Sequence, residues 1–87
     1  MGDDYYSTLS ERFETLVSSV VTELDCDELA EVQHYLNHDE FGAALFYILA
    51  VIVEQGQKPS RAILEQISWL VDRMEIRDDL PELPFTV

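Results

Sequence analysis

The side chains of this sequence that could do chemistry gather in one stretch, around Cys26, His34, His38 and Asp39. A cysteine paired with a histidine can act as a nucleophile, provided that a third group orients the histidine. Nothing in the spacing brings Cys26 to either histidine, so we expect no catalytic residue. A free cysteine beside a helix start is more typical of a small packing residue, and we interpret Cys26 in that way.

The same stretch also predicts no metal site. His34 and His38 are four residues apart, but they would share a helical face only if the helix continued through Asn37, where we expect it to end. The ligand set matches no zinc pattern, and Asp25 to Asp27 lacks the glycine and the terminal glutamate of a calcium loop. The three glycines are scattered rather than grouped in a phosphate-binding loop. We therefore predict no cofactor and no enzymatic function.

Charge is the strongest compositional feature, with 18 Asp and Glu against 5 Lys and Arg and a formal net charge of -13. No Lys or Arg lies between Phe13 and Gln57. That stretch contains the acids Glu14, Glu23, Asp25, Asp27, Glu28, Glu31, Asp39, Glu40 and Glu54. Such a field repels nucleic acid and anionic membranes and speeds encounter with basic partners. We predict a basic protein partner, with solubility alone as the alternative explanation of the charge.

Apolar residues recur at helical spacing in four segments. We predict helices over residues 8–23, 27–37, 40–54 and 60–76, followed by an extended tail over residues 77–87. Ser7 is expected to cap the first helix, and Asp25 with Glu28 resembles a capping box for the second. Pro59 and Ser60 are expected to open the fourth.

The third predicted helix is different in kind, because no charged residue lies from Phe41 to Val53. A helix that is apolar on nearly every side is expected to be central and buried. Gly42 and Ala43 are expected to allow close helix contact, so that Gly42→Leu would overpack the core, and Gly56 is expected to end the helix. With 47% apolar residues, the chain is predicted to be a single all-α domain. The expected architecture is a compact four-helix bundle with a buried apolar third helix and an extended C-terminal tail.

The apolar stretch is shorter than the about 20 residues that span a bilayer. The first residues have neither the basic start nor the apolar run of a signal peptide. We expect a soluble, cytoplasmic protein.

Since no chemistry is predicted, the surface of the acidic segment is the candidate site. Carboxylates with aromatic residues beside them are typical of protein interfaces. The predicted partner-binding residues are Glu23, Asp25, Asp27, Glu28, Glu31, Tyr35, His38, Asp39 and Glu40. Tyr35 is either an interface contact or a partly packed core residue. Trp69 and Tyr47 lie on helix flanks, where an aromatic residue is either the edge of the core or a binding anchor.

The segment from Leu36 to Leu45 resembles the MafI-like immunity proteins, which include the CdiI proteins of contact-dependent growth inhibition. These are small acidic helical proteins whose signature is a short loop followed by Glu, an aromatic, Gly, a variable residue, Ala and Leu. Asp39, Glu40, Phe41, Gly42, Ala44 and Leu45 occupy those places. The resemblance extends to a C-terminal helix that ends at Val71-Asp72-Arg73-Met74 and covers about Leu9 to Ile76.

The resemblance implies an immunity protein that binds and neutralises the toxic domain of a cognate toxin in a stoichiometric complex. Many such toxins are nucleases, whose clefts are basic because they hold phosphate. An acidic helical surface would then cover the cleft or block it from beside. Two other hypotheses stay open. One is an acidic DNA-mimic inhibitor of a restriction or CRISPR nuclease, and the other is a helical adaptor whose third helix lies partly in a dimer interface.

Overall fold

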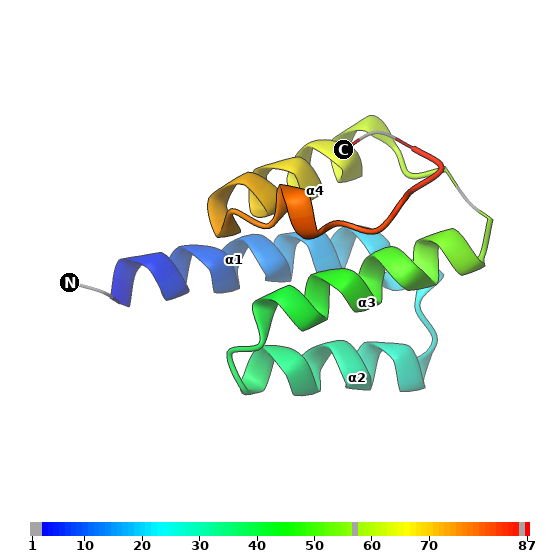
Figure 1. The fold of residues 1–87 in the computed structure, drawn as a ribbon. Coiled ribbons are helices and arrows are strands. Elements are labelled where there is room, and N and C mark those ends of the chain that lie inside the picture. The colour runs from blue at the N-terminus through cyan, green and yellow to red at the C-terminus, as the bar shows by residue number, and fades with distance from the viewer. Residues whose placement is uncertain (1–2, 57, 86) are drawn as a thin grey trace.

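The computed structural model describes residues 3–56, 58–85 and 87, with the side chains of Asp3, Asp4, Tyr6 and Glu23 outside the described part. In chain order the elements are α1 (Asp3–Val20), the 3-10 helix η1 (Val21–Glu23), α2 (Cys26–Asn37), α3 (Phe41–Glu54), α4 (Arg61–Met74) and the 3-10 helix η2 (Arg77–Asp79) (Figure 1). No strand occurs within these residues, so the predicted all-α class is confirmed. The radius of gyration is 12.2 Å, close to the about 12 Å expected of a compact chain of this length.

The helices pack as two pairs, α1 along α4 and α2 along α3. In Figure 1, α1 and α3 occupy the middle of the molecule, with α4 above and α2 below. The rings of Phe13 on α1 and Phe41 on α3 join the two pairs, with centroids 5.5 Å apart. The centre of the molecule is therefore shared by two helices, not formed by α3 alone.

Every buried residue in the described part of the chain is apolar. These residues are Leu9, Phe13, Leu16, Val17, Val20, Leu24, Val32, Phe41, Ala44, Leu45, Ile48, Leu49, Val51, Ile52, Ile67, Leu70 and Val71. Helix α3 supplies many of them, whereas α2 supplies Val32 only. Because α2 contributes so little to the core, it is an outer helix, and most of its surface carries polar side chains to solvent.

Helix α3 is not enclosed on all sides, since Ala43, Ala50 and Val53 are exposed. The expected close contact at Gly42 is also wrong, because a Cβ placed there would meet no heavy atom of a neighbouring element within 4 Å. Gly42 lies in the first turn of α3 and is half-exposed. A Cβ at position 42 therefore does not by itself overpack the core.

Helix α1 begins at Asp3 rather than at residue 8, so Ser7 lies inside the helix and does not cap it. The reason is tertiary. Tyr5 is half-buried against the core, and the guanidinium carbon of Arg73 on α4 lies 4.9 Å from its ring centroid. These contacts stabilise the additional helical residues before position 8, which the apolar stripe does not predict.

Helix α4 ends at Met74, slightly before the predicted end at residue 76, because Glu75 adopts a left-handed conformation with φ of 57°. The chain then turns back over the bundle, beginning with η2. We call residues 77–85 the C-terminal segment. Leu80, Leu83 and Phe85 in it are half-buried against the core.

Arg77 fixes the path of this segment. It donates hydrogen bonds to Asp72 Oδ1 (Nε, 2.8 Å), to Ser68 Oγ (Nη2, 3.1 Å) and to the main-chain oxygen of Val87 (Nη1, 2.7 Å). Among the residues described, no helix has both the length and the apolar character that crossing a bilayer requires.

Candidate functional site

The acidic face of α2 begins at a capping box, as predicted from Asp25 and Glu28. Asp25 Oδ1 accepts a hydrogen bond from the Glu28 amide (2.8 Å), and Glu28 Oε1 accepts one from the Asp25 amide (3.0 Å). Both carboxylates are thereby held at the positive end of the helix dipole. Two of the predicted site residues therefore stabilise α2 itself, in addition to any part they have in binding.

Asp27, Glu31 and His34 follow one another along the outer side of α2, and His38 continues this line at the helix end. All four are exposed. The ion pairs found in the described residues are Arg61–Glu65 and Arg77–Asp72, neither of which involves α2. The carboxylates of α2 are therefore not neutralised from within the part of the chain that the structure describes.

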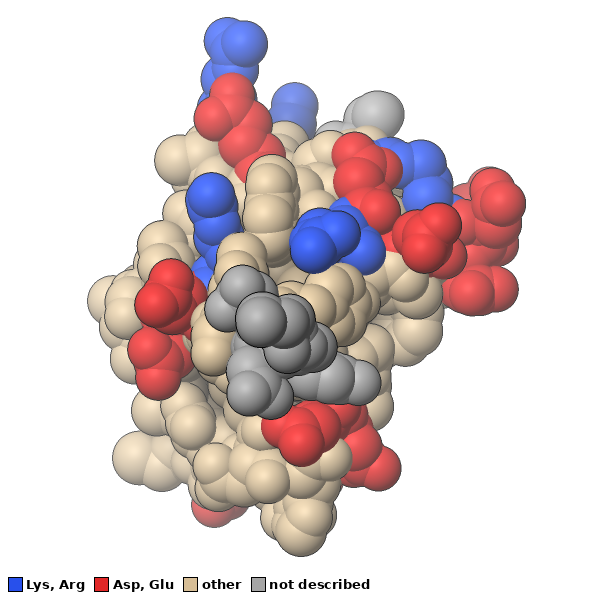
Figure 2. All heavy atoms as spheres, turned by 90° about the vertical axis from the view of Figure 1, so that its left-hand side faces the viewer, with Lys and Arg blue, Asp and Glu red and all other residues tan. Residues whose placement is uncertain are grey.

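Basic residues are confined to one of the two helix pairs, whereas acidic residues occur on both. The basic residues Arg12, Lys58, Arg61, Arg73 and Arg77 lie on α1, on α4 or beside α4, and none lies on α2 or α3. Figure 2 shows this at the end of the molecule near the start of α1. The basic atoms in this view all lie in the upper half, together with acidic atoms, and the lower part shows acidic atoms but no basic ones. The α2–α3 pair thus presents a negative surface uninterrupted by cations.

A line of aromatic rings crosses this surface. The ring centroids of His38 and His34 are 4.6 Å apart, those of His34 and Tyr35 are 6.1 Å apart, and Tyr35 lies 6.1 Å from Tyr47 on α3. Helix α2 ends at Asn37 as expected, but the expectation that His34 and His38 would then not share a face is wrong, because the C-cap residue His38 still places its ring beside that of His34.

A local motif closes the helix at that point. Asp39 adopts a left-handed conformation with φ of 57° and donates its amide to Leu36 O (3.2 Å), and the Glu40 amide bonds to Tyr35 O (2.8 Å). This is the Schellman pattern, which usually places Gly or Asn where Asp39 stands. Glu40 is the N-cap of α3 but makes no side-chain cap hydrogen bond.

Cys26 is exposed at the start of α2, so its interpretation as a packing residue is wrong. The reason is that α2 buries so little of its surface. In the described residues no group of three or more His, Cys, Asp or Glu side chains is placed to hold a metal ion.

Tyr47 lies within the electric field of the α2 carboxylates. Desolvation raises the pKa of its hydroxyl above the ordinary value of 10.0, and Glu28, Glu31, Asp25 and then Tyr35 raise it further. Its ring contact with Tyr35 places Tyr47 beside the carboxylates of α2, although it belongs to another helix. From the sequence, Tyr47 was predicted only to lie on a helix flank, since nothing local indicates which side of α2 it approaches.

The structure brings together Asp25, Asp27, Glu28, Glu31, Tyr35 and His38 on α2 and at its ends, while Asp39 and Glu40 lie in the turn that follows. Glu23 lies in η1, and its side chain is outside the described residues. His34 and Tyr47 also lie on this surface, although neither was among the predicted partner-binding residues. The i, i+4 spacing of His34 and His38 was a usable signal for the first of them. We call the following residues the acidic face: Asp25, Asp27, Glu28, Glu31, His34, Tyr35, His38, Asp39, Glu40 and Tyr47.

Helix α2 has 12 residues and is therefore about 18 Å long. Along it the acidic face offers carboxylate acceptors and aromatic rings, held on a regular backbone. Carboxylates bind guanidinium and ammonium groups through charge-assisted hydrogen bonds, and aromatic rings attract the same cations. The face is therefore suited to Lys and Arg side chains.

Comparison with protein-family models, with curated proteins and with solved structures found no match for this chain.

Proposed function

We propose that this chain is an immunity protein, which binds the toxic domain of a cognate toxin in the cytoplasm as a stoichiometric inhibitor. The observation that carries the proposal is the acidic face itself. Its carboxylates project from one outer helix, in a half of the molecule where the structure describes no cation. The sequence resemblance around Asp39 to Leu45 supports the same function.

The proposed partner is a nuclease domain. A nuclease cleft is basic because it holds the phosphate backbone, and the carboxylates of Asp27 and Glu31 would take the place of phosphates there. Opposite charge would steer the two proteins together and raise the association rate. Tyr35 and His38 would contact the partner beside the carboxylates and slow dissociation.

The test is a charge reversal with a matched control. Asp27→Lys with Glu31→Lys changes two exposed residues that take no part in the capping box. Glu11→Lys with Glu14→Lys makes the same charge change on α1, also at exposed positions. The α2 variant is expected to lose affinity for the toxin domain by at least about tenfold, because close charge pairs at interfaces contribute more than 1 kcal/mol.

Binding is measured by calorimetry, and protection by growth of cells that express the toxin. The α1 variant should bind and protect nearly as well as the original chain. Unchanged affinity of the α2 variant would remove the acidic face from the proposal, and equal losses in both variants would mean that only net charge matters.

A second pair of substitutions separates charge from helix stability. Asp25→Ser and Glu28→Gln keep side chains that can form a capping box but remove both negative charges. We expect the helical circular dichroism spectrum to be retained while toxin binding weakens. Full binding by this variant would show that Asp25 and Glu28 serve only the fold.

The neighbouring gene distinguishes the proposal from its alternative. A large toxin gene directly upstream supports an immunity protein. A position within a prophage, without such a gene, would instead support a DNA-mimic inhibitor of a restriction or CRISPR nuclease.

A further inference from the structure

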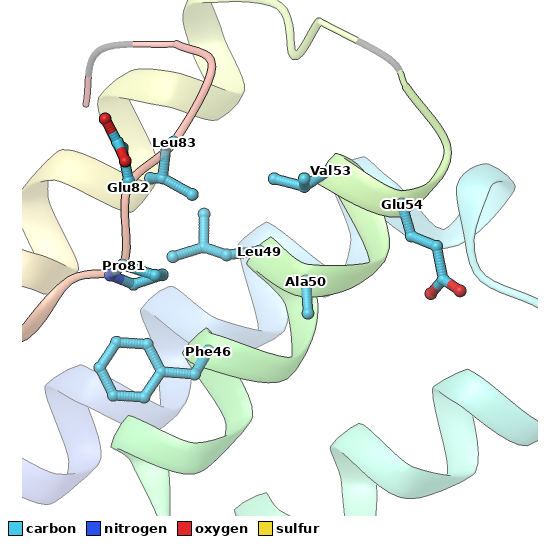
Figure 3. Close-up of a pocket in the computed structure, with 8 residues that line it drawn as sticks. All are labelled: Phe46, Leu49, Ala50, Val53, Glu54, Pro81, Glu82 and Leu83. Carbon is cyan, nitrogen blue, oxygen red and sulfur yellow. The ribbon is translucent and has the colours of Figure 1, made fainter.

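A groove of about 400 Å³ lies between α3 and the C-terminal segment (Figure 3). Leu49, at the bottom, is fully buried, and Phe46 and Leu83 stand half-buried at the sides. Figure 3 shows Leu83 pointing across the groove toward Leu49 and Val53, with Pro81 beside Phe46. The volume is near the lower end of the about 300–1,000 Å³ typical of binding pockets. It suits one or two apolar side chains.

Val53 at the edge of this groove is unusually exposed for its type. Its exposed fraction is 38%, and the other exposed large apolar residue in the described part of the chain is Val21, at 42%. Ala50, one turn before Val53, is exposed as well. Ala50 and Val53 thus present exposed apolar surface on α3 that continues into the groove.

The rim of the groove is acidic. Glu82 comes from the C-terminal segment, and Glu54 comes from α3 on the opposite side (Figure 3). Neither belongs to the ion pairs found in the described residues. An occupant that matches this groove has an apolar side chain with Lys or Arg nearby. A second copy of the chain matches poorly, because each copy has a net charge of -13.

We infer that this groove is a second docking surface, which receives an apolar side chain of the basic partner while Glu54 and Glu82 bind flanking Lys or Arg residues. The inference rests on the proposed function, since it assigns a further contact to the same partner. The exposed strip of α3 consists of Ala43, Ala50 and Val53. The acidic face lies on its Tyr47 side and the groove on its Phe46 side. One partner surface can therefore reach both.

The experiment uses a defined probe and does not need the toxin. The probe is a synthetic peptide of about 15 residues, the length at which an isolated helix becomes stable, with two leucines four residues apart and flanking lysines. One control peptide replaces the leucines by alanine, and a second replaces the lysines by glutamate. Amide chemical shifts of the isotopically labelled full chain are followed by NMR as each peptide is added.

The leucine–lysine peptide is expected to shift the amides of Ala50, Val53 and Leu83. The alanine peptide keeps the charge and should move mainly α2 resonances, such as those of Asp27 and Glu31. The glutamate peptide should not bind. Shifts confined to α2 with the leucine peptide would overturn the groove as a docking surface, and so would equal groove shifts with the alanine peptide.

Two valine variants sharpen the result. Val53→Asp and Val21→Asp each place an added negative charge at an exposed valine near a helix end. If charge alone holds the peptide, both variants bind it as well as the original or better. If the groove holds an apolar side chain, Val53→Asp weakens binding by about tenfold, since a buried aliphatic contact contributes more than 1 kcal/mol. Val21→Asp then does not weaken it. Val53→Thr keeps nearly the same shape and should also weaken peptide binding. It replaces Val53→Asp in the experiment if that variant fails to fold.

The two proposals can fail separately. Loss of peptide binding by Val53→Asp, together with toxin protection that survives Asp27→Lys and Glu31→Lys, would support the groove and remove the acidic face. If Val53→Asp binds the peptide as well as the original chain does, the groove is overturned as a docking surface, whereas the proposal for the acidic face is unaffected.

Discussion

Tyr35 on α2 and Tyr47 on α3 lie with ring centroids 6.1 Å apart and ring planes at 55°, across the contact between the two helices. Both residues are half-buried, so each is at once part of the packing and part of the surface. This pair confirms that Tyr35 is a partly packed residue, while its contact with a partner stays a prediction. It also links the acidic face on α2 with the exposed strip of α3.

Tyr47 should titrate later than an ordinary tyrosine. Its pKa is raised by desolvation and then by Glu28, Glu31 and Asp25, so the folded chain holds this proton more tightly than the unfolded chain does. The corresponding stability is present below pH 10 and is lost as the pH rises through the raised pKa. Tyr47→Phe should therefore lose less stability than the original chain in alkaline solution, as measured by urea unfolding at several pH values.

Charge removal provides the control for that titration. Glu28→Gln should lower the pKa of Tyr47 toward its ordinary value, as followed by the ultraviolet absorbance of tyrosinate. Glu14→Gln on α1 should leave it unchanged, because Glu14 is not among the groups that act on Tyr47. Equal effects of the two variants would contradict the placement of Tyr47 beside the acidic face.

Gly42 and Gly56 should respond in opposite directions to alanine. Gly42 is helical with open space around it, so Gly42→Ala should stabilise the chain by up to about 1 kcal/mol. Gly56 has φ of 68°, and Gly56→Ala should destabilise it by about 1 kcal/mol or more. Chemical denaturation measures both free energies of unfolding. Destabilisation by Gly42→Ala would restore the close helix contact first expected there.

Arg77 should control the order of the C-terminal segment more than the global stability. Its pair with Asp72 is substantially exposed, with side-chain exposures of 43% and 64%, so Arg77→Gln should cost less than about 1 kcal/mol of unfolding free energy. Hydrogen exchange at Leu80 and Leu83 should nevertheless become faster, because the bonds to Ser68 and Val87 are lost as well.

The control for Arg77 is Arg61→Gln, which breaks the exposed Arg61–Glu65 pair. Exchange in the C-terminal segment should not change in this variant. If Arg77→Gln also leaves that exchange unchanged, apolar packing alone holds the segment in place.

Gln66 carries a buried polar atom that finds no partner among the described residues. Its Nε2 donates to Ser19 Oγ (3.3 Å), but its Oε1 accepts no hydrogen bond from this part of the chain. Reversing the amide would only exchange which atom lacks a partner. Gln66→Met keeps the shape and removes the unsatisfied group, so it should stabilise the chain by about 1 kcal/mol.

Gln33→Met is the matched control for Gln66→Met, because Gln33 is exposed on α2. It should bring no gain in the denaturation midpoint. A loss of stability in Gln66→Met would mean that the bond to Ser19 outweighs the cost of the buried oxygen.

The sequence by itself determined the features that depend on near neighbours in the chain. Apolar periodicity located the four helices, and the capping box at Asp25 and Glu28 followed from their spacing. Ser60 likewise caps α4, as expected, by accepting a hydrogen bond from the Ile63 amide (3.3 Å). These features were predictable because caps and amphipathic stripes involve residues a few positions apart.

Tertiary structure alone decided where the surfaces meet. The early start of α1 depends on contacts between Tyr5 and α4, and the open space around Gly42 depends on which side of α3 the other helices leave free. Two further features join residues that are distant in the chain. One is the contact between Tyr35 and Tyr47, and the other is the groove between Val53 and Leu83. A helical pattern fixes the periodicity of a face but not its partner, because the partner is chosen by the packing of the whole core.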